Sequence, residues 1–221
     1  MKNNIINGII VFAVALLAPQ ILQAQGTMTY LSNVDQASAG SLTVGSDLWL
    51  AAAFQTGTNA SGYTLDSIEL GMADASGSPS GFTVTLYKRY TGALDIRGPS
   101  LGTLDGSLNP TTAGIYTYTP DSSLTLSANT QYVIMLSAGT TVASGAYDWS
   151  VANGSYDTSG NWGIAGIFSS SDGGSRWTGI SGNAVQFSID AIPIPEPGVL
   201  ALSGLGGLLI LWHRRKSKAV L

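Results

Sequence analysis

Cysteine is absent from this sequence of 221 residues, and histidine occurs once, as His213 near the C-terminal end. Without cysteine there is no disulfide, thiol nucleophile, thiolate metal site or iron–sulfur cluster, so a buried core must hold the fold together. Without a histidine upstream of the tail, the central region also lacks the imidazole of a Ser-His-Asp triad or a histidine zinc site. We therefore expect a protein that is not an enzyme and that carries no cofactor and no metal.

Charge is also scarce, and positive charge is nearly missing from the central region. Charged residues make up 10% of the sequence, well below the level of about a quarter that is usual. Between about residues 25 and 197, all 13 acidic residues stand against four basic ones, which leaves a net charge of about −9. The four basic residues are Lys88, Arg89, Arg97 and Arg176. Proteins that bind nucleic acid need basic residues to neutralise phosphates, so we predict no nucleic-acid partner.

The first 24 residues have the pattern of a secretory signal peptide. Met1 and Lys2 give a positive start, an apolar core runs from about residue 9 to residue 17, and Ala24 offers a small residue for cleavage. Leu22 is larger than the small residue usual at the third position before a cut. An uncleaved anchor is the alternative, but the apolar core is short for a membrane span. We expect export by the general secretion machinery.

The C-terminal segment joins three features in order. It begins with a rigid step, Pro195-Glu196-Pro197, because each proline fixes φ and disfavours helix in the residue before it. Residues 198–212 are then uncharged and apolar, and as a helix they would cover roughly 22 Å of a hydrocarbon core of about 30 Å. A positive cluster follows: Arg214, Arg215 and Lys216. This cluster would stay in the cytoplasm and orient a short transmembrane helix at 198–212 with the exported region outside.

This order of motif, short apolar helix and arginine cluster over residues 194–218 closely resembles the PEP-CTERM sorting signal. The resemblance implies recognition by an exosortase, an integral-membrane processing enzyme that is by analogy a cysteine-dependent, sortase-like transpeptidase. It implies processing at or near Pro195-Glu196-Pro197 in bacteria with a Gram-negative envelope, commonly ones that make exopolysaccharide. The chain would be an inner-membrane intermediate facing the periplasm, and would then reach the cell surface or extracellular matrix. The alternative is a plain tail anchor, which also leaves the exported region facing outward.

Residues 28–192, which we call the body, alternate short apolar runs with turns rich in glycine, serine and aspartate. The expected strands cover residues 48–54, 62–72, 81–90, 114–120, 123–138, 146–152, 161–168 and 184–192, with a turn at 128–130. A period of two is clear in residues 81–90, where Phe82, Val84 and Leu86 share one face. Roughly eight to ten short strands without an amphipathic helix predict an all-β fold, an antiparallel β-sandwich that is jelly-roll-like.

The acidic residues of the body form no evident catalytic pair or metal site. A glycosidase needs two carboxylates about 5–10 Å apart across a cleft. Asp66 and Glu69 lie in one expected strand, and their odd separation predicts opposite faces. Turns at 157–161 and 172–174 contain aspartate and glycine, which suit calcium ligands but are equally favoured in turns for backbone reasons. Neither turn has the regular spacing of a calcium loop.

Tryptophans gather in the last third of the body, as Trp149, Trp162 and Trp177. Flat aromatic rings exposed on a β-sandwich can stack on sugar rings, which makes these three residues candidates for carbohydrate stacking. Burial is the alternative, because large rings contribute much apolar area to a core. Tyr147 and Trp149 share one parity on an expected strand and could both point inward.

Several stretches of the body resemble the choice-of-anchor R domain over about residues 30–192; they are GYTLDSIEL, FTVTLYKR, LGTLDGS, AGIYTYTP, LTLSANTQYVIMLS, YDWSVANG and SRWTGISG before a closing FSIDAI strand. That family occurs on bacterial surface proteins with different C-terminal anchors, and it carries no assigned reaction. We therefore predict a non-enzymatic, exported envelope or extracellular-matrix protein with a structural or adhesive role. The alternative is a carbohydrate-binding surface module that recognises exopolysaccharide.

Overall fold

The computed structural model describes residues 26–90, 95–182 and 184–196. It contains two units: one is Gly26–Ile194, and the other is made of the two chain ends, of which only Pro195 and Glu196 are described. All regular elements in the described residues are β-strands, and none of these residues forms a helix able to cross a membrane. The expected signal peptide at 1–24 and the expected transmembrane helix at 198–212 lie outside the described residues.

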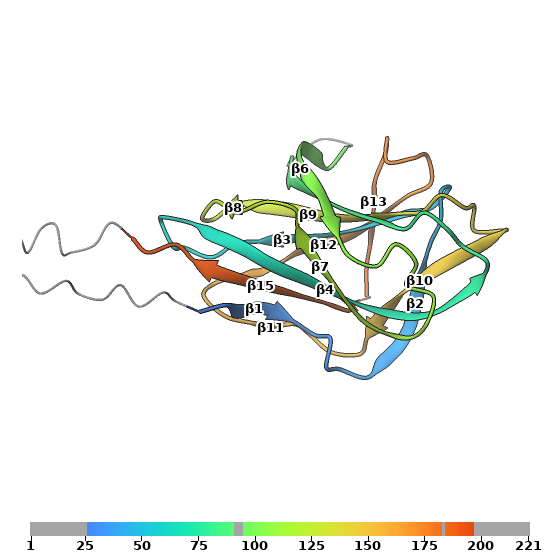
Figure 1. Ribbon diagram of the computed structural model, residues 1–221, viewed down its shortest axis with the longest axis horizontal. Helices are drawn as coiled ribbons and strands as arrows, with labels where there is room; N and C mark the ends of the chain where they lie inside the picture. The colour runs from blue at the N-terminus through green and yellow to red at the C-terminus, as the bar shows by residue number, and fades with distance from the viewer. Residues whose placement is uncertain (1–25, 91–94, 183, 197–221) are drawn as a thin grey trace, which may run out of the picture. The chain divides into compact units, whose positions relative to one another are not determined.

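The described residues of the unit Gly26–Ile194 form 15 strands (Figure 1). In chain order they are β1 (Met28–Ser32), β2 (Ser38–Val44), β3 (Trp49–Gln55), β4 (Tyr63–Gly77), β5 (Thr83–Arg89), β6 (Arg97–Asp105), β7 (Gly114–Pro120), β8 (Leu124–Leu126), β9 (Gln131–Ser137), β10 (Gly145–Ala152), β11 (Asp157–Thr158), β12 (Gly163–Ser170), β13 (Thr178–Ile180), β14 (Ala184–Val185) and β15 (Phe187–Pro193). Each expected strand overlaps at least one of them. The predicted turn at 128–130 joins β8 to β9, and Asn129 takes the left-handed conformation there, with φ of 49°.

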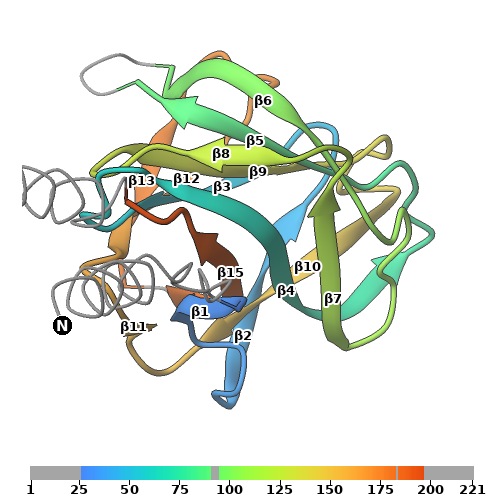
Figure 2. The ribbon, with the colours of Figure 1, turned by 60° about the vertical axis from the view of Figure 1, so that its left-hand side comes forward.

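The strands form two layers that face one another (Figure 2). Sheet A contains β1, β2, β4, β10, β14 and β15, with β7, β8 and β11 at its margins. Sheet B has the strand order β6-β5-β9-β3-β12-β13. The layers join where β6 pairs with β7, so the whole is one curled sheet in which all pairs of the described strands are antiparallel. The predicted all-β, antiparallel sandwich is therefore confirmed.

The core fills the space between sheets A and B. Trp149 and Tyr147 on β10 are both 0% exposed, as their shared parity predicts. The predicted alternation along residues 81–90 is also confirmed, because Phe82, Val84 and Leu86 all belong to the core. Their neighbours of opposite parity face outward, which gives sheet B an outer face of its own.

One strand departs from simple alternation. The register of β4 against β15 slips by one residue around Asp66, which is the mark of a β-bulge. As a result Leu65 and Ile68 are both buried in the core, while Asp66 is exposed and Glu69 is half-buried on the outer side of sheet A. The prediction that Asp66 and Glu69 lie on opposite faces is therefore wrong, because the extra residue removes one step of the period of two.

Candidate binding surfaces and the sorting segment

The end of β15 leads directly into the expected sorting step. The main-chain N–H of Ile194 donates to the carbonyl of Gly62 at 3.0 Å. The side-chain Nδ2 of Asn59 donates to the carbonyl of Ile194 at 2.9 Å. We call these two contacts the exit clamp. Because β1 begins beside the end of β15, both ends of this unit leave the sandwich on the same side (Figure 1).

The sorting step begins one residue after the exit clamp, since Pro195 follows Ile194 in the chain. Pro195 and Glu196 are described, whereas Pro197 and the positive cluster lie outside the described residues; that cluster is Arg214, Arg215 and Lys216. The roles assigned to these residues in recognition and orientation stay predictions. The structure shows that the residue held by the exit clamp, Ile194, directly precedes Pro195, so no linker separates the folded strands from the sorting step.

Two of the three tryptophans proposed for carbohydrate stacking lie between the layers. Trp149 is 0% exposed, and its indole N–H donates to the carbonyl of Gln186 at 2.8 Å. Trp162 is 3% exposed and stacks on Tyr30 and Phe54, with ring centroids 4.9 Å and 5.8 Å away. Neither ring presents a face to a sugar. The stacking assignment is therefore corrected in favour of the core alternative for both residues.

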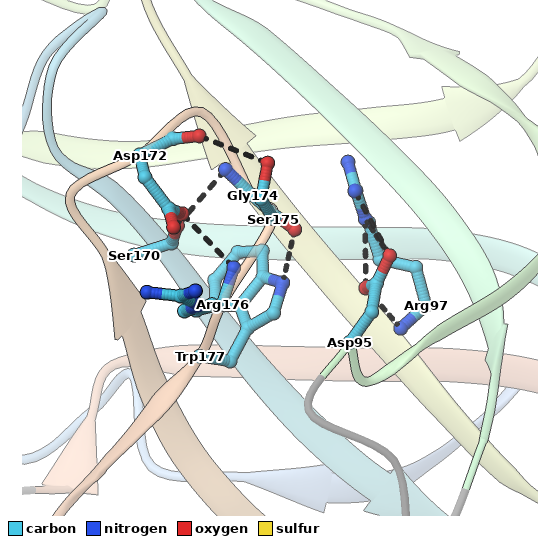
Figure 3. Close-up of polar contacts among 8 residues, drawn as sticks. All are labelled: Asp95, Arg97, Ser170, Asp172, Gly174, Ser175, Arg176 and Trp177. Carbon is cyan, nitrogen blue, oxygen red and sulfur yellow. Dashed lines mark hydrogen bonds and ion pairs between the residues drawn. The ribbon is translucent and has the colours of Figure 1, made fainter.

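Trp177 is buried in a different place, on the outer side of sheet B. It packs with Ala51 and Ala53 on β3, whose small side chains leave room for the indole. Its N–H donates to the carbonyl of Gly174 at 2.9 Å, within its own loop (Figure 3). The ring covers an apolar patch and is 9% exposed, so its assignment to sugar stacking is corrected as well.

The loop between β12 and β13 is organised by Asp172 (Figure 3). Its carboxylate accepts hydrogen bonds from the main-chain N–H of Arg176 at 2.9 Å and from the Ser170 hydroxyl at 2.8 Å. These donors hold the pKa of Asp172 below its usual value. The aspartate therefore serves the turn itself. In the ranges that the structure describes, no group of three or more acidic or histidine side chains could hold a metal ion.

A guanidinium–carboxylate pair lies beside this loop. Arg97 Nε lies 3.0 Å from Oδ1 of Asp95, and hydrogen bonds from Arg97 hold the pKa of Asp95 below its usual value. The guanidinium carbon also lies 6.0 Å from the Trp49 ring centroid. A β-carbon placed on Gly174 would come within 2.7 Å of Arg97 and 2.9 Å of Trp49. The loop therefore rests directly on both side chains.

A polar groove of about 460 Å³ opens on the outer side of sheet A. Asp35, Glu69 and Asp157 bring three carboxylates to its lining, and most of the other lining residues carry hydroxyl or amide groups. Burial raises the pKa of Glu69, and the negative charges of Asp190 and Asp35 raise it further. The lining contains no lysine or arginine. Such a groove can exchange hydrogen bonds with a hydroxyl-rich ligand and repels anions.

Sequence reasoning did not predict this groove. Its lining comes from β1 and the loop after it, β4, β7, β11 and β15, and only the strand order brings these segments together. β1 pairs with both β11 and β15, and β15 pairs with β4. The residues are scattered along the chain with no local motif, so a search by spacing could not have found them.

The sorting segment is the part of the chain for which a comparison with protein families is informative. Residues 193–216 match the family model described as the PEP-CTERM protein-sorting motif. The chain carries a PEP-CTERM sorting signal. It is therefore an exported protein that is sorted to the cell envelope, and the signal implies recognition by an exosortase-type processing enzyme. The resemblance of the body to the choice-of-anchor R domain stays a prediction.

Comparison with curated proteins gave no match. Among solved structures, the fold resembles the crystal structure of the cysteine protease and lectin-like domains of Cwp84, a surface layer associated protein of Clostridium difficile. The match has 12% sequence identity and a TM-score of 0.50, and it covers 75% of this chain but only 36% of that chain. At this identity the likeness concerns the fold alone. A cysteine protease needs a thiol nucleophile, which a chain without cysteine cannot supply.

Proposed function

We propose that the body is a non-enzymatic structural or adhesive module of the cell surface or extracellular matrix. An exosortase-type enzyme would process the chain at or near Pro195-Glu196-Pro197 while residues 198–212 hold it in the inner membrane, with the body in the periplasm. The observation that carries this proposal is the sorting motif at 193–216, which begins at the end of β15. The exit clamp supports it, because the folded body ends one residue before the step.

A non-enzymatic role is supported by the residue types that the sequence lacks. The groove offers carboxylates, hydroxyls and amides, but the chain has no cysteine and its single histidine lies in the tail. General acid–base and nucleophilic mechanisms most often draw on imidazole or an activated nucleophile paired with a base. A structural or adhesive role uses the same surface groups without that requirement.

Processing is tested by intact mass spectrometry of the chain secreted by its own host. The mature form should lack the residues after the PEP step, and Glu196→Ala should leave the full-length chain in the membrane fraction. Asp121→Ala is the matched control, because it removes one exposed carboxylate in the turn after β7 and should leave processing unchanged. A secreted form that still contains Arg214 and Arg215 would refute the proposal.

A carbohydrate-binding surface module is the second candidate. Its support is the polar groove, the aromatic outer face of sheet B, and the presence of lectin-like domains in the protein whose fold this one resembles. The test is a glycan array probed with the full chain in detergent. Saturable binding to one class of glycan would support the module, and uniform absence of binding would remove it while leaving the sorting proposal intact.

A further inference from the structure

Arg89 lies across the outer face of sheet B. From the end of β5 its side chain reaches over β9 and β3, and Nη1 donates to Oε1 of Gln131 at 2.8 Å and to the carbonyl of Ala165 at 3.0 Å. Ala165 on β12 sits at a slip in the register with β3, so its carbonyl is available to a side-chain donor. One nitrogen of the guanidinium is thus fixed, and the rest of the group is held in a defined place.

The charge on Arg89 has no carboxylate partner among the described residues, where the ion pair present is Arg97 with Asp95. Nε of Arg89 is in addition buried without a hydrogen-bond partner. Burial lowers the pKa of Arg89, which means that the surroundings disfavour its charge. An anion bound beside the exposed end of the guanidinium would offset that cost.

Rings and amides surround this guanidinium on the same face. Its carbon lies 4.9 Å from the centroid of the Phe168 ring, and Tyr87 stands two residues earlier on β5, half-buried. Nε2 of Gln131 donates to Oε1 of Gln55 at 3.3 Å, which continues the polar row onto β3. Aromatic faces pack against the apolar side of sugar rings, and amides hydrogen-bond hydroxyls in both directions. The combination favours an anion that is carried on a sugar.

We propose that this face of sheet B binds a carboxylate-bearing sugar, a uronate unit of an acidic polysaccharide, with Arg89 as the receptor for its carboxylate. The proposal rests on the carbohydrate-binding function above and names its site and ligand class. The carboxylate would accept hydrogen bonds from Nη2, the terminal nitrogen of the guanidinium that Gln131 and Ala165 do not occupy. Arginine suits this role because its guanidinium stays charged at neutral pH and holds its N–H donors in a fixed plane.

The distribution of charge permits a polyanion to approach, although the body as a whole is acidic. The four basic residues of the body all belong to sheet B or to the loop between β12 and β13: Lys88, Arg89, Arg97 and Arg176. The strands of sheet A contain no lysine or arginine. An anionic chain therefore meets less repulsion at sheet B than at the groove.

The test is isothermal titration of the full chain in detergent with an oligomer of galacturonic acid. A neutral galactose oligomer of the same length and free galacturonic acid are the other two arms. We expect saturable binding of the uronate oligomer that weakens at high salt and that Arg89→Gln reduces at least about tenfold. Arg176→Gln removes an equal charge from an exposed position of the neighbouring loop and should leave affinity nearly unchanged. Tyr87→Ala tests the same face without touching the contacts of Arg89, and it should also weaken binding.

The outcomes separate this proposal from the one on which it rests. Equal affinity for the neutral and uronate oligomers would overturn the role of Arg89 and leave carbohydrate binding in place. Uronate binding that survives both Arg89→Gln and Tyr87→Ala would move the site elsewhere and also overturn the proposal. Thermal denaturation shows whether Arg89→Gln unfolds the chain. If it does, the affinity of Tyr87→Ala for the uronate oligomer decides: weakened binding supports the proposal and unchanged binding overturns it. Binding of free galacturonic acid as tight as the oligomer would show a carboxylate pocket without a polysaccharide subsite, which contradicts the stated ligand class.

Discussion

The outer faces of the two layers differ in chemistry although the same core lies beneath both. The outer face of sheet A carries a polar groove with Asp35, Glu69 and Asp157, and the strands of that sheet have no basic residue. The outer face of sheet B carries a second, smaller apolar cluster that includes Trp177, together with Arg89 and Arg97. Net charge alone would have described the body as uniformly acidic. The difference shows that the basic side chains are confined to sheet B and its loop, so the two faces can have different partners.

The largest loss of stability is expected for a substitution in the core that lies beneath both sheets. Trp149→Ala removes a fully buried indole from the common core and should lower the free energy of unfolding by about 3–5 kcal/mol. Trp177→Ala removes a ring that covers only the outer side of sheet B, so its loss should be clearly smaller. Urea denaturation measures both values. Equal losses would contradict the division into an inner core and an outer cluster.

A smaller loss of stability is expected for a substitution in the loop between β12 and β13, which packs on sheet B. Gly174→Ala places a β-carbon against Arg97 and Trp49 at a φ of +86°, and it should destabilise the chain by roughly 1–3 kcal/mol. Gly173→Ala is the matched control, because its φ of +69° gives similar backbone strain but no atom lies within 4 Å of the new carbon. Thermal denaturation should therefore show a larger shift for Gly174→Ala. Equal shifts would mean that the loop does not press on sheet B.

The smallest effect concerns the charge on sheet A. Because the pKa of Glu69 is raised in the folded state, ionisation of Glu69 opposes folding. The stability is complete below the unfolded pKa and is lost as pH rises through the folded pKa. Glu69→Gln should therefore stabilise the chain at pH 7, by a few tenths of a kcal/mol because solvent screens this half-exposed group.

The gain from Glu69→Gln should vanish as pH falls to about 4, where glutamate is increasingly protonated in both states. Asp121→Asn, at an exposed turn, serves as the control for a change of net charge. A gain for Glu69→Gln that does not change with pH would show that the groove does not repel the charge on Glu69.

Much of the fold could be predicted from the sequence because period-two alternation is a local property. The faces assigned to Phe82, Val84 and Leu86 are those of the structure. The prediction for Asp66 and Glu69 was wrong because one bulged residue inverts the face of every later residue in the strand. The sequence has no local feature that indicates this bulge. Strand pairing, which joins β6 to β7 and closes the layers together, depends on contacts between distant residues and has no local signature.

The surfaces were harder to predict than the fold. The sequence shows Trp149, Trp162 and Trp177, but it does not show whether a ring on a strand faces the core, solvent or a loop that folds over it. Trp177 illustrates the third case, because two alanines on β3 make the space that it fills. The sorting signal could be recognised in advance for the opposite reason: its motif, apolar run and positive cluster are contiguous in the chain.

The exit clamp has a mechanical consequence for the mature protein. The residues of the step, Pro195, Glu196 and Pro197, span at most about 10 Å when fully extended, and the prolines restrict how that short stretch can bend. If processing falls within Pro195-Glu196-Pro197, the body is joined to its acceptor by a linker only a few residues long. A short linker confines a domain to a small volume and raises its effective concentration near binding sites within reach. Binding sites beyond that reach cannot be contacted. The body would then contact only partners close to its point of attachment, within the layer in which it is embedded.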